Sequence, residues 1–326
     1  MMMGYFLRRI FYALPILIGI NLLTFALFFM VNSPDDMARM QLGQKHITET
    51  AVTEWKIERG YNYPLFYNRE AEGVNKFRDT LFFKKSLRLF VFDFGFSDAG
   101  RDIKQDISTR MWPSFAIALP SLLFGLIVNI TFAMLMVFFR GTYLDLSGVI
   151  FCIMLMSISS LFYIMGGQYL FGKVLRLVPI SGYDYGLESL KFIILPVMVS
   201  VISGLGGGGR WYRTLFIEEM HKDYVKTARA KGLSERRVLF RHVLKNAMLP
   251  ILTGVVVIIP TLFMGSLVLE SFFGIPGLGS YLIDAIYQQD FAIVRAMVFL
   301  GSVLYLVGLM LTDVSYVWLD PRVRLA

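Results

Sequence analysis

The sequence predicts an all-α membrane protein with six transmembrane helices. The 326-residue chain has a mean hydropathy of +0.60, and 56% of its residues are hydrophobic while only 17% are charged. These values depart from those of soluble globular proteins in the direction of bilayer proteins. Six apolar runs each approach the ~20 residues with which a helix crosses the hydrocarbon core. The expected spans are residues 10–31, 112–139, 146–171, 192–208, 249–269 and 296–319.

The first apolar run begins like a signal peptide, because Arg8 and Arg9 precede it. Its length, from Ile10 to Val31, exceeds that of a typical signal-peptide core, and no small-x-small cleavage site follows it. We therefore predict an uncleaved first transmembrane helix.

The Lys and Arg residues predict the orientation of the spans. With a cytoplasmic amino terminus, the inside segments hold fifteen Lys and Arg, ten of them between Arg210 and Lys245, and the short outside segments hold four. Cytoplasmic loops accumulate positive charge, so both termini are expected to face the cytoplasm. The net charge of +8 then follows from membrane topology.

Residues 32–111 form a long segment on the outside of the membrane. They combine balanced charge with many aromatic side chains, among them Trp55, Tyr61 and Phe94. This composition supplies enough apolar surface to fold, so we expect an extracytoplasmic cap between the first two helices. The cap either stabilises the spans or docks a soluble partner.

The cytoplasmic loop after the fourth span predicts a helical hairpin. Phe216, Met220, Tyr224 and Ala228 recur every four residues and share one stripe of a helix. Gly232 is suited to end that helix in the left-handed conformation. A new helix is expected to start after it, with Ser234 as the N-cap and Glu235 in the first turn.

The second helix of the hairpin has two chemically different faces. Arg237, Arg241 and Lys245 line one face, and the apolar face consists of Leu239, Phe240, Val243, Leu244, Ala247 and Met248. Such a helix can lie in a groove of a partner protein, or its cations can touch anionic headgroups. A DNA-binding role is disfavoured, because a recognition helix tethered between two spans has little freedom to enter a groove, and we expect no nucleic acid partner.

The hairpin sequence is also similar to a known one. Residues 223–250 read "DYVKTARAKGLSERRVLFRHVLKNAMLP", with Pro-Gly-Leu-Gly at 276–279, "VPISGY" at 178–183, Asp-x-Gly-x-Ser at 93–97 and "WLDPRVR" at 318–324. These stretches resemble the EAA loop and flanking motifs of permease subunits of binding-protein-dependent ABC importers. The resemblance is to the dipeptide/oligopeptide/nickel branch, first permease subunit type, and covers nearly the whole chain.

The resemblance implies a type I ABC importer permease fold in a bacterial cytoplasmic (inner) membrane. Residues 1–31 would hold the amino terminus and first helix, residues 32–111 the cap, and residues 112–326 the permease core with a coupling loop at 209–248. In the family this loop docks on an ATPase subunit. The implied coupling residues are Asp223, Tyr224, Thr227, Ala228, Arg229, Ala230, Gly232, Leu233, Arg241, His242, Asn246 and Pro250.

The resemblance also implies the partners. They are a second homologous permease, two cytoplasmic ATPase subunits that carry ATP and magnesium, and an extracytoplasmic substrate-binding protein, all in contact with membrane lipid. The chain has no G-x-x-x-x-G-K-[ST] motif and is expected to hold no cofactor and no catalytic site of its own.

Two features depart from the family pattern. "NSPDD" at residues 32–36 replaces the usual Pro-Gly-Asp-Pro, and Ser114 and Phe115 stand where a Thr is expected after Pro113. The tetraglycine at 206–209 is also unusual. It completes a G-x-G-x-x-G pattern with Gly204, but no βαβ unit surrounds it, so we expect it to allow close helix packing or a bend.

Other residues give weaker signals. His46, His221 and His242 are isolated and form no metal-ligand pattern, and Cys152 is the only cysteine. Four ionisable residues lie in or beside the spans: Asp145, Glu270, Arg295 and Asp313. Charges at such depth usually face a cavity or a partner, and we take Glu270 and Asp313 as candidate pore or gate residues.

Two other functions remain open on the residues alone. An ion-gradient-driven transporter or channel predicts paired charges deep in several spans, which this sequence lacks. A membrane scaffold or receptor could recruit a partner through the basic loop without transporting anything. The sequence does not disclose the solute, which within the resembled branch includes peptides, nickel chelates, glycosides and peptide-like antibiotics.

Overall fold

The computed structural model describes residues 2–43 and 48–319, and the side chains of residues 8–43 and 48–315. Within these ranges the regular secondary structure is helical. One isolated antiparallel β-bridge joins Phe96 and Asp102 in the described part of the chain. The chain divides into two compact units. One comprises residues 2–110 and 281–310, and the other residues 111–280 and 311–319. The carboxy-terminal Asp-Pro-Arg motif at 320–322 lies outside the described residues.

Five helices of the described part are long and apolar enough to cross a membrane. They are Arg8–Val31, Ile103–Phe138, Gly186–Met220, Glu235–Met264 and Phe291–Ser315. A sixth candidate is the pair Tyr143–Ser157 and Ser160–Val174, which is bent by 87°. The predicted all-helical membrane fold is confirmed, while the third expected span, residues 146–171, is broken rather than continuous.

The break in the third span lies at Ile158 and Ser159, whose backbones are extended. Helix α6 (Tyr143–Ser157) ends there and α7 (Ser160–Gly167) begins, followed by the π-helical turn η4 (Gln168–Val174). The Ser157 hydroxyl donates to the carbonyl of Ile153 at 2.9 Å, and the Tyr163 hydroxyl donates to that of Leu155 at 2.8 Å. Side-chain hydroxyls thus satisfy backbone groups at the break, as an apolar environment requires.

The first unit contains α1 (Met2–Ala26), η1 (Leu27–Val31) and the short helices of the segment that follows. These are α2 (Pro34–Leu42), α3 (Glu49–Glu58), α4 (Asn75–Arg78), η2 (Phe82–Ser86) and η3 (Leu87–Val91). Their apolar side chains pack on the end of α1 in a core of Phe25, Phe29, Met37, Ala38, Val52, Trp55, Tyr61 and Leu81. Most of α13 (Leu278–Tyr287) and the first part of α14 (Phe291–Leu319) belong to the same unit.

The unusual "NSPDD" stretch has a local structural role. The Ser33 hydroxyl accepts from the backbone N–H of Asp36 at 3.2 Å, and the Asp36 carboxylate accepts from the Ser33 N–H at 3.1 Å. This reciprocal capping box starts α2 with Pro34 in its first turn. The Ser33 hydrogen bonds also lower the pKa of Asp36.

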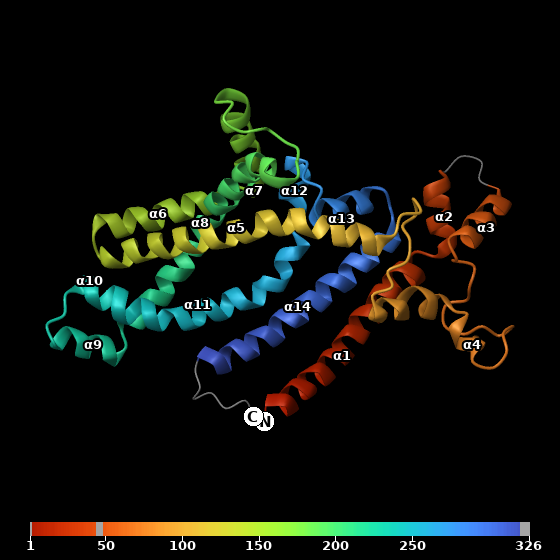
Figure 1. Cartoon of the computed structure of the whole chain (residues 1–326), viewed down its shortest axis with the longest axis horizontal. Helices are drawn as coiled ribbons and strands as arrows, with labels where there is room; N and C mark the ends of the chain where they lie inside the picture. The colour runs from red at the N-terminus through yellow and green to blue at the C-terminus, as the bar shows by residue number, and fades with distance from the viewer. Residues whose placement is uncertain (1, 44–47, 320–326) are drawn as a thin grey trace. The chain divides into compact units, whose positions relative to one another are not determined.

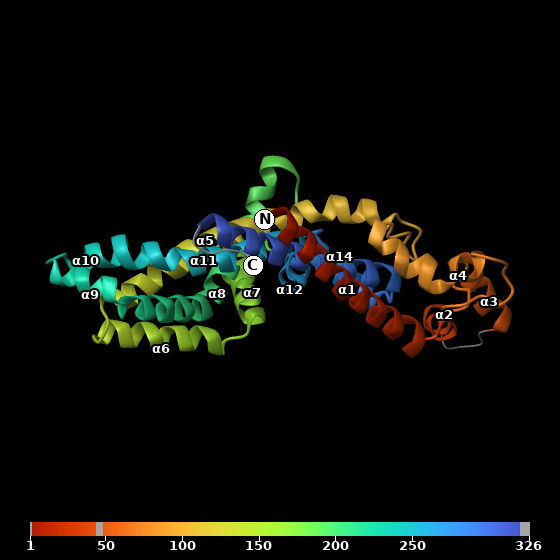
Figure 2. The same ribbon diagram turned by 90° about the horizontal axis from the view of Figure 1, so that it is seen from below.

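The second unit contains most of α5 (Ile103–Phe138), α6 to α7, η5 (Gly186–Glu188) and α8 (Ser189–Met220). It continues with α9 (Asp223–Ala230), α10 (Glu235–Val238), η6 (Leu239–Val243), α11 (Leu244–Ile258), η7 (Ile259–Met264) and α12 (Leu267–Phe273). Figure 1 shows α9 and α10 at the end of α8 and α11, and Figure 2 shows α6 alongside α8.

The tetraglycine lies inside α8 without interrupting it. A Cβ at Gly206 would meet the carbonyl oxygen of Cys152 on α6, and one at Gly208 would overlap the Asn129 side chain on α5. The glycines therefore permit close helix packing, and they do not interrupt the helix. The fifth span also ends earlier than expected. Gly265, with a φ of +67°, separates Met264 from α12.

Candidate functional site

The hairpin between the fourth and fifth expected spans starts with a break rather than a continuous helix. Helix α8 ends at Met220, and Lys222 is extended, with a φ of −72° and a ψ of 151°. The expected single stripe from Phe216 to Ala228 is therefore divided between α8 and α9. Across the break the Tyr224 hydroxyl donates to the Glu219 carboxylate at 2.6 Å. Burial and this carboxylate raise the pKa of Tyr224 to about 12.

Gly232 ends α9 as its position in the sequence predicts. Its φ is +75°, its N–H donates to the carbonyl of Arg229 at 2.9 Å, and the N–H of Leu233 donates to that of Ala228 at 3.3 Å. These two bonds are those of a Schellman motif, which satisfies the last carbonyls of the helix. Ser234 then has the backbone conformation of an N-cap, but its side chain makes no capping hydrogen bond.

An ion pair joins the two short helices on the outside of the turn. The guanidinium of Arg229 contacts the carboxylate of Glu235 through two hydrogen bonds of 2.8 and 3.1 Å. The paired fork geometry constrains orientation as well as distance. The hairpin is thus held both by its backbone turn and by a side-chain clamp.

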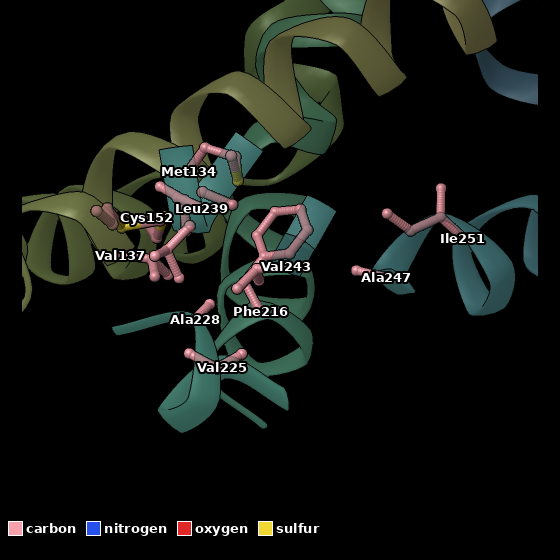
Figure 3. Packing of buried hydrophobic residues seen from close by; sticks show 13 residues of the cluster. Met134, Val137, Cys152, Phe216, Val225, Ala228, Leu239, Val243, Ala247 and Ile251 are labelled. Atoms are coloured by element: carbon pink, nitrogen blue, oxygen red, sulfur yellow. The ribbon is translucent and has the colours of Figure 1, made fainter. Parts of the chain in front are cut away.

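The inner face of the hairpin packs into a continuous apolar core. Val225 and Ala228 of α9 belong to the same buried cluster as Phe216 of α8 and Val243 of η6 (Figure 3). Met134, Val137 and Cys152 contribute from α5 and α6. Val225 and Val243 are completely buried. The hairpin is therefore packed against the long helices that flank it.

The structure changes the surface that α9 can offer to a partner. Ala228, which the sequence placed on the contact stripe, is 4% exposed because it lies in this core. The opposite face of α9 is exposed and carries Asp223, Lys226, Thr227, Ala230 and the Gly232 turn. We call these five residues the outer face of the hairpin.

The second helix has the expected two faces, with one exception. Leu239, Val243 and Ala247 are buried, and Arg237, Arg241 and Lys245 are exposed. Phe240 was expected on the apolar face but is 55% exposed. Of the other predicted coupling residues, Arg229 and Asn246 are exposed, whereas Tyr224, Leu233, His242 and Pro250 are half-buried.

Glu270 occupies a second distinctive position in this unit. Its side chain is 1% exposed and accepts backbone hydrogen bonds from Ser266 and Ser280, both at 3.1 Å. The hydroxyl of Ser114 also bonds to the carboxyl group and accepts from the N–H of Leu278 at 2.8 Å. A single carboxylate thus ties α12 to the start of α13 and to α5.

Glycine backbones surround this carboxylate closely. A Cβ on Gly265 or Gly277 would coincide with one of the two carboxylate oxygens of Glu270. Glu270 borders a cavity of about 360 Å³ whose polar lining includes Ser121, Ser200, Thr261 and Ser266. Its oxygens already hold backbone donors, so its role as a pore or gate residue stays a prediction.

The other ionisable residues of the spans occupy different surroundings. Asp145 at the start of α6 accepts two hydrogen bonds from Arg213 of α8, at 2.8 and 2.9 Å. Arg295 in α14 is 4% exposed. Asp313 is half-buried in α14, within the last candidate span. The sequence could not reveal these partners, because they are distant along the chain. Arg213 lies 68 residues from Asp145, and Ser114 lies more than 150 residues from Glu270.

Fold and site together define a polytopic helical membrane protein with a packed helical hairpin between two of its long helices. The comparisons with known proteins give the family. The family model for the "Binding-protein-dependent transport system inner membrane component" matches residues 129–325. The chain belongs to this family, and the fold is its type I permease fold, so the resemblance seen in the sequence is confirmed.

Individual relatives match along their whole length. The chain is 28% identical to the oligopeptide transport system permease protein AppB of Bacillus subtilis, over 99% of this chain and 100% of that protein. It is 30% identical to a putative peptide transport system permease protein of Brucella melitensis, over 99% of both chains. It is 28% identical to the dipeptide transport system permease protein DppB of Escherichia coli K12, again over 99% of both.

Proposed function

We propose that this chain is the transmembrane permease subunit of an ATP-driven importer that moves peptides or peptide-like solutes across a bacterial cytoplasmic membrane. The family is that of binding-protein-dependent transport components, and the full-length relatives are named as peptide, oligopeptide or dipeptide permeases. Their names support peptides as the solute class. Both termini are taken to face the cytoplasm, because the Lys and Arg residues concentrate there.

The hairpin is the observation that carries the coupling part of the proposal. Its inner face is packed against α5, α6 and α8, whereas its outer face is exposed and polar. A partner that binds the outer face can therefore move the long helices through a rigid contact rather than a flexible loop. The Schellman turn at Gly232 and the Arg229–Glu235 clamp add to that rigidity.

In this proposal, separate ATPase subunits supply the energy for transport. The sequence holds no P-loop motif, so two cytoplasmic ATPases would bind ATP and magnesium, and the chain itself would carry no catalytic site. ATP binding would draw the ATPases together and move the hairpins with them. The spans of this chain and of a second, homologous permease would then open toward a loaded binding protein on the outside.

Co-purification tests this proposal directly. A tagged copy of the chain, expressed with the transporter subunits of its own cell, is expected to bring down a second permease and two ATPases. In liposomes the complex should hydrolyse ATP faster when a peptide-loaded binding protein is present than when the empty protein is added. Solute uptake by this chain alone, or purification without any ATPase, would contradict the proposal.

A further inference from the structure

A cavity of about 550 Å³ lies in the first unit, between α3, the η2–η3 segment and the start of α14. Positive side chains outnumber negative ones in its lining, with five cations and three carboxylates. The cations are Arg59, Lys84, Lys85, Arg88 and Arg295, and the carboxylates are Glu58, Asp93 and Asp98. The proposed transport function does not account for this cavity.

Three of the five cations have a carboxylate partner. Arg59 pairs with Asp98 at 3.3 Å, Lys84 with Asp79 at 3.0 Å and Arg88 with Asp93 at 3.4 Å. Their charge is therefore compensated locally.

Lys85 and Arg295 make hydrogen bonds to backbone carbonyls instead. Lys85 donates to Arg59 at 2.7 Å, and Arg295 donates to Phe291 at 3.2 Å and to Lys85 at 3.5 Å. Among the described residues neither cation has a carboxylate within ion-pair distance, although Asp98 and Asp290 act on Arg295 from farther away. Burial, together with the charge of Arg295, lowers the pKa of Lys85 to about 8. An anion in the cavity would relieve this repulsion.

The position of Arg295 indicates the depth of the cavity. It lies in the second turn of α14, and its guanidinium is 4.7 Å from the ring centre of Phe29, in the last turn of the first candidate span. The cavity therefore lies level with the ends of two apolar helices, which is the depth of the headgroups in a bilayer.

Exposed apolar side chains lie beside the cavity. Phe96 lines the cavity and is 69% exposed. Leu87, Val91 and Phe92, which are close in sequence to the lining residues Arg88, Leu89 and Asp93, are exposed as well. Cations next to exposed aromatic and aliphatic groups fit an amphipathic anion better than a purely polar one.

We propose that this cavity binds the phosphate of an anionic phospholipid headgroup, with Lys85 and Arg295 as the principal cations and the apolar rim in contact with the lipid. The cations and the apolar rim match the two chemical parts of such a lipid, its charged headgroup and its acyl chains. Free phosphate carries the same negative charge but has no apolar group that could contact the rim. The two sources are therefore separable by experiment.

Lipid titration of the purified whole transporter tests the proposal. Short-chain phosphatidylglycerol, short-chain phosphatidylcholine and inorganic phosphate are added in separate arms, and bound ligand is counted by native mass spectrometry. Phosphatidylglycerol is expected to bind more tightly than either of the others. Lys85→Gln should weaken that binding about fivefold. Arg88→Gln, at the exposed rim, should weaken it by a smaller factor, because Asp93 already compensates part of the charge of Arg88. Arg69→Gln, on an exposed cap residue outside the cavity, should not weaken it.

The melting temperature of each variant shows whether it is folded, and the rim variant Arg88→Gln keeps the test valid if Lys85→Gln unfolds. Three results would overturn the proposal. One is unchanged phosphatidylglycerol binding in the folded Lys85→Gln and Arg88→Gln variants. Another is equal binding of phosphatidylcholine or of inorganic phosphate. The third is a weaker affinity of these variants for the substrate-binding protein while phosphatidylglycerol binding is unchanged. That result would mean that the cavity binds an acidic surface of the binding protein.

Discussion

The helical hairpin after α8 and the loop around Glu270 both carry residues that match the family's motifs, but they bury them very differently. On the hairpin, Thr227, Ala230 and Gly232 are exposed. Around Glu270, the backbone of the Pro-Gly-Leu-Gly stretch is enclosed, with Leu278 and Ile275 each 1% exposed. An exposed motif points to a partner, whereas an enclosed one points to a requirement of the fold itself. Substitutions in the two regions should therefore separate stability from assembly.

The largest loss of stability is expected for Glu270→Ala. The substitution leaves the N–H groups of Ser266 and Ser280 and the Ser114 hydroxyl without their shared acceptor in a buried site. We expect a loss of about 3 kcal/mol or more. Glu270→Gln should also be destabilised, because its amide N–H₂ would face backbone donors. Thermal unfolding of the purified transporter measures both. A melting temperature equal to that of the unchanged protein would refute the role of Glu270 as an anchor.

Two glycines with positive φ should differ in their response to alanine. Gly265 has a φ of +67° and a Cβ there would overlap the Glu270 carboxylate, whereas Gly232 has a φ of +75° and open space around its Cβ position. Gly232→Ala should cost about 1 kcal/mol, from the left-handed backbone alone. Gly265→Ala should cost clearly more, because the clash adds to a backbone conformation, φ +67° and ψ −168°, that is almost restricted to glycine. Equal melting temperatures for the two variants would show that the Glu270 site can rearrange.

A smaller effect with a distinct pH dependence is expected for Tyr224→Phe. The variant loses the 2.6 Å hydrogen bond to Glu219, which should cost about 1.5 kcal/mol near neutral pH. Since the pKa of Tyr224 is raised to about 12, the advantage of the unchanged protein is complete below pH 10. It should decline as the pH rises from 10 through 12, because the unfolded tyrosine ionises first. A difference that stays constant over this range would argue against the buried hydrogen bond.

The outer face of the hairpin should show no measurable effect on stability. Asp223 and Lys226 form an ion pair on the surface, with side chains 94% and 69% exposed. Asp223→Ala and Lys226→Ala should therefore leave the melting temperature unchanged. Both should weaken ATPase binding in a pull-down, which separates them from Glu270→Ala. Destabilisation of either variant would mean that the outer face contributes to the fold.

Much of the fold could be predicted because its signals are local. The apolar runs identified the long helices, and Gly232 identified the turn of the hairpin. The four-residue spacing from Phe216 to Ala228 predicted one helix, which is broken at Lys222. The break at Ile158 was not predicted, because residues 146–171 contain no proline and no charged residue and stay apolar across it. Hydropathy measures composition, and it does not distinguish a straight helix from a bent one.

The site was predictable only in part, since burial depends on contacts distant in sequence. A stripe of apolar residues cannot show whether it faces a partner or the chain's own core, and Ala228 proved to face the core. The environment of Glu270 was hidden for a similar reason, because Ser114 and Gly277 converge on it from separate helices and loops. The glycine-rich stretch beside an acidic residue was the available signal.

Cross-linking from two neighbouring positions of α9 tests the central claim most directly. Cys152 is buried, so Ala230→Cys can be labelled with a maleimide–benzophenone reagent in the assembled transporter under conditions that leave Cys152 unlabelled. Ala228→Cys, which lies in the same buried core as Cys152, should take up no more reagent than Cys152 does. Ala230 is exposed and Ala228 is 4% exposed, although both are on the same short helix. The account predicts that illumination joins position 230 to an ATPase subunit and position 228 to none. Cross-links from position 228 alone, or from neither position with labelling at 230 verified, would contradict it.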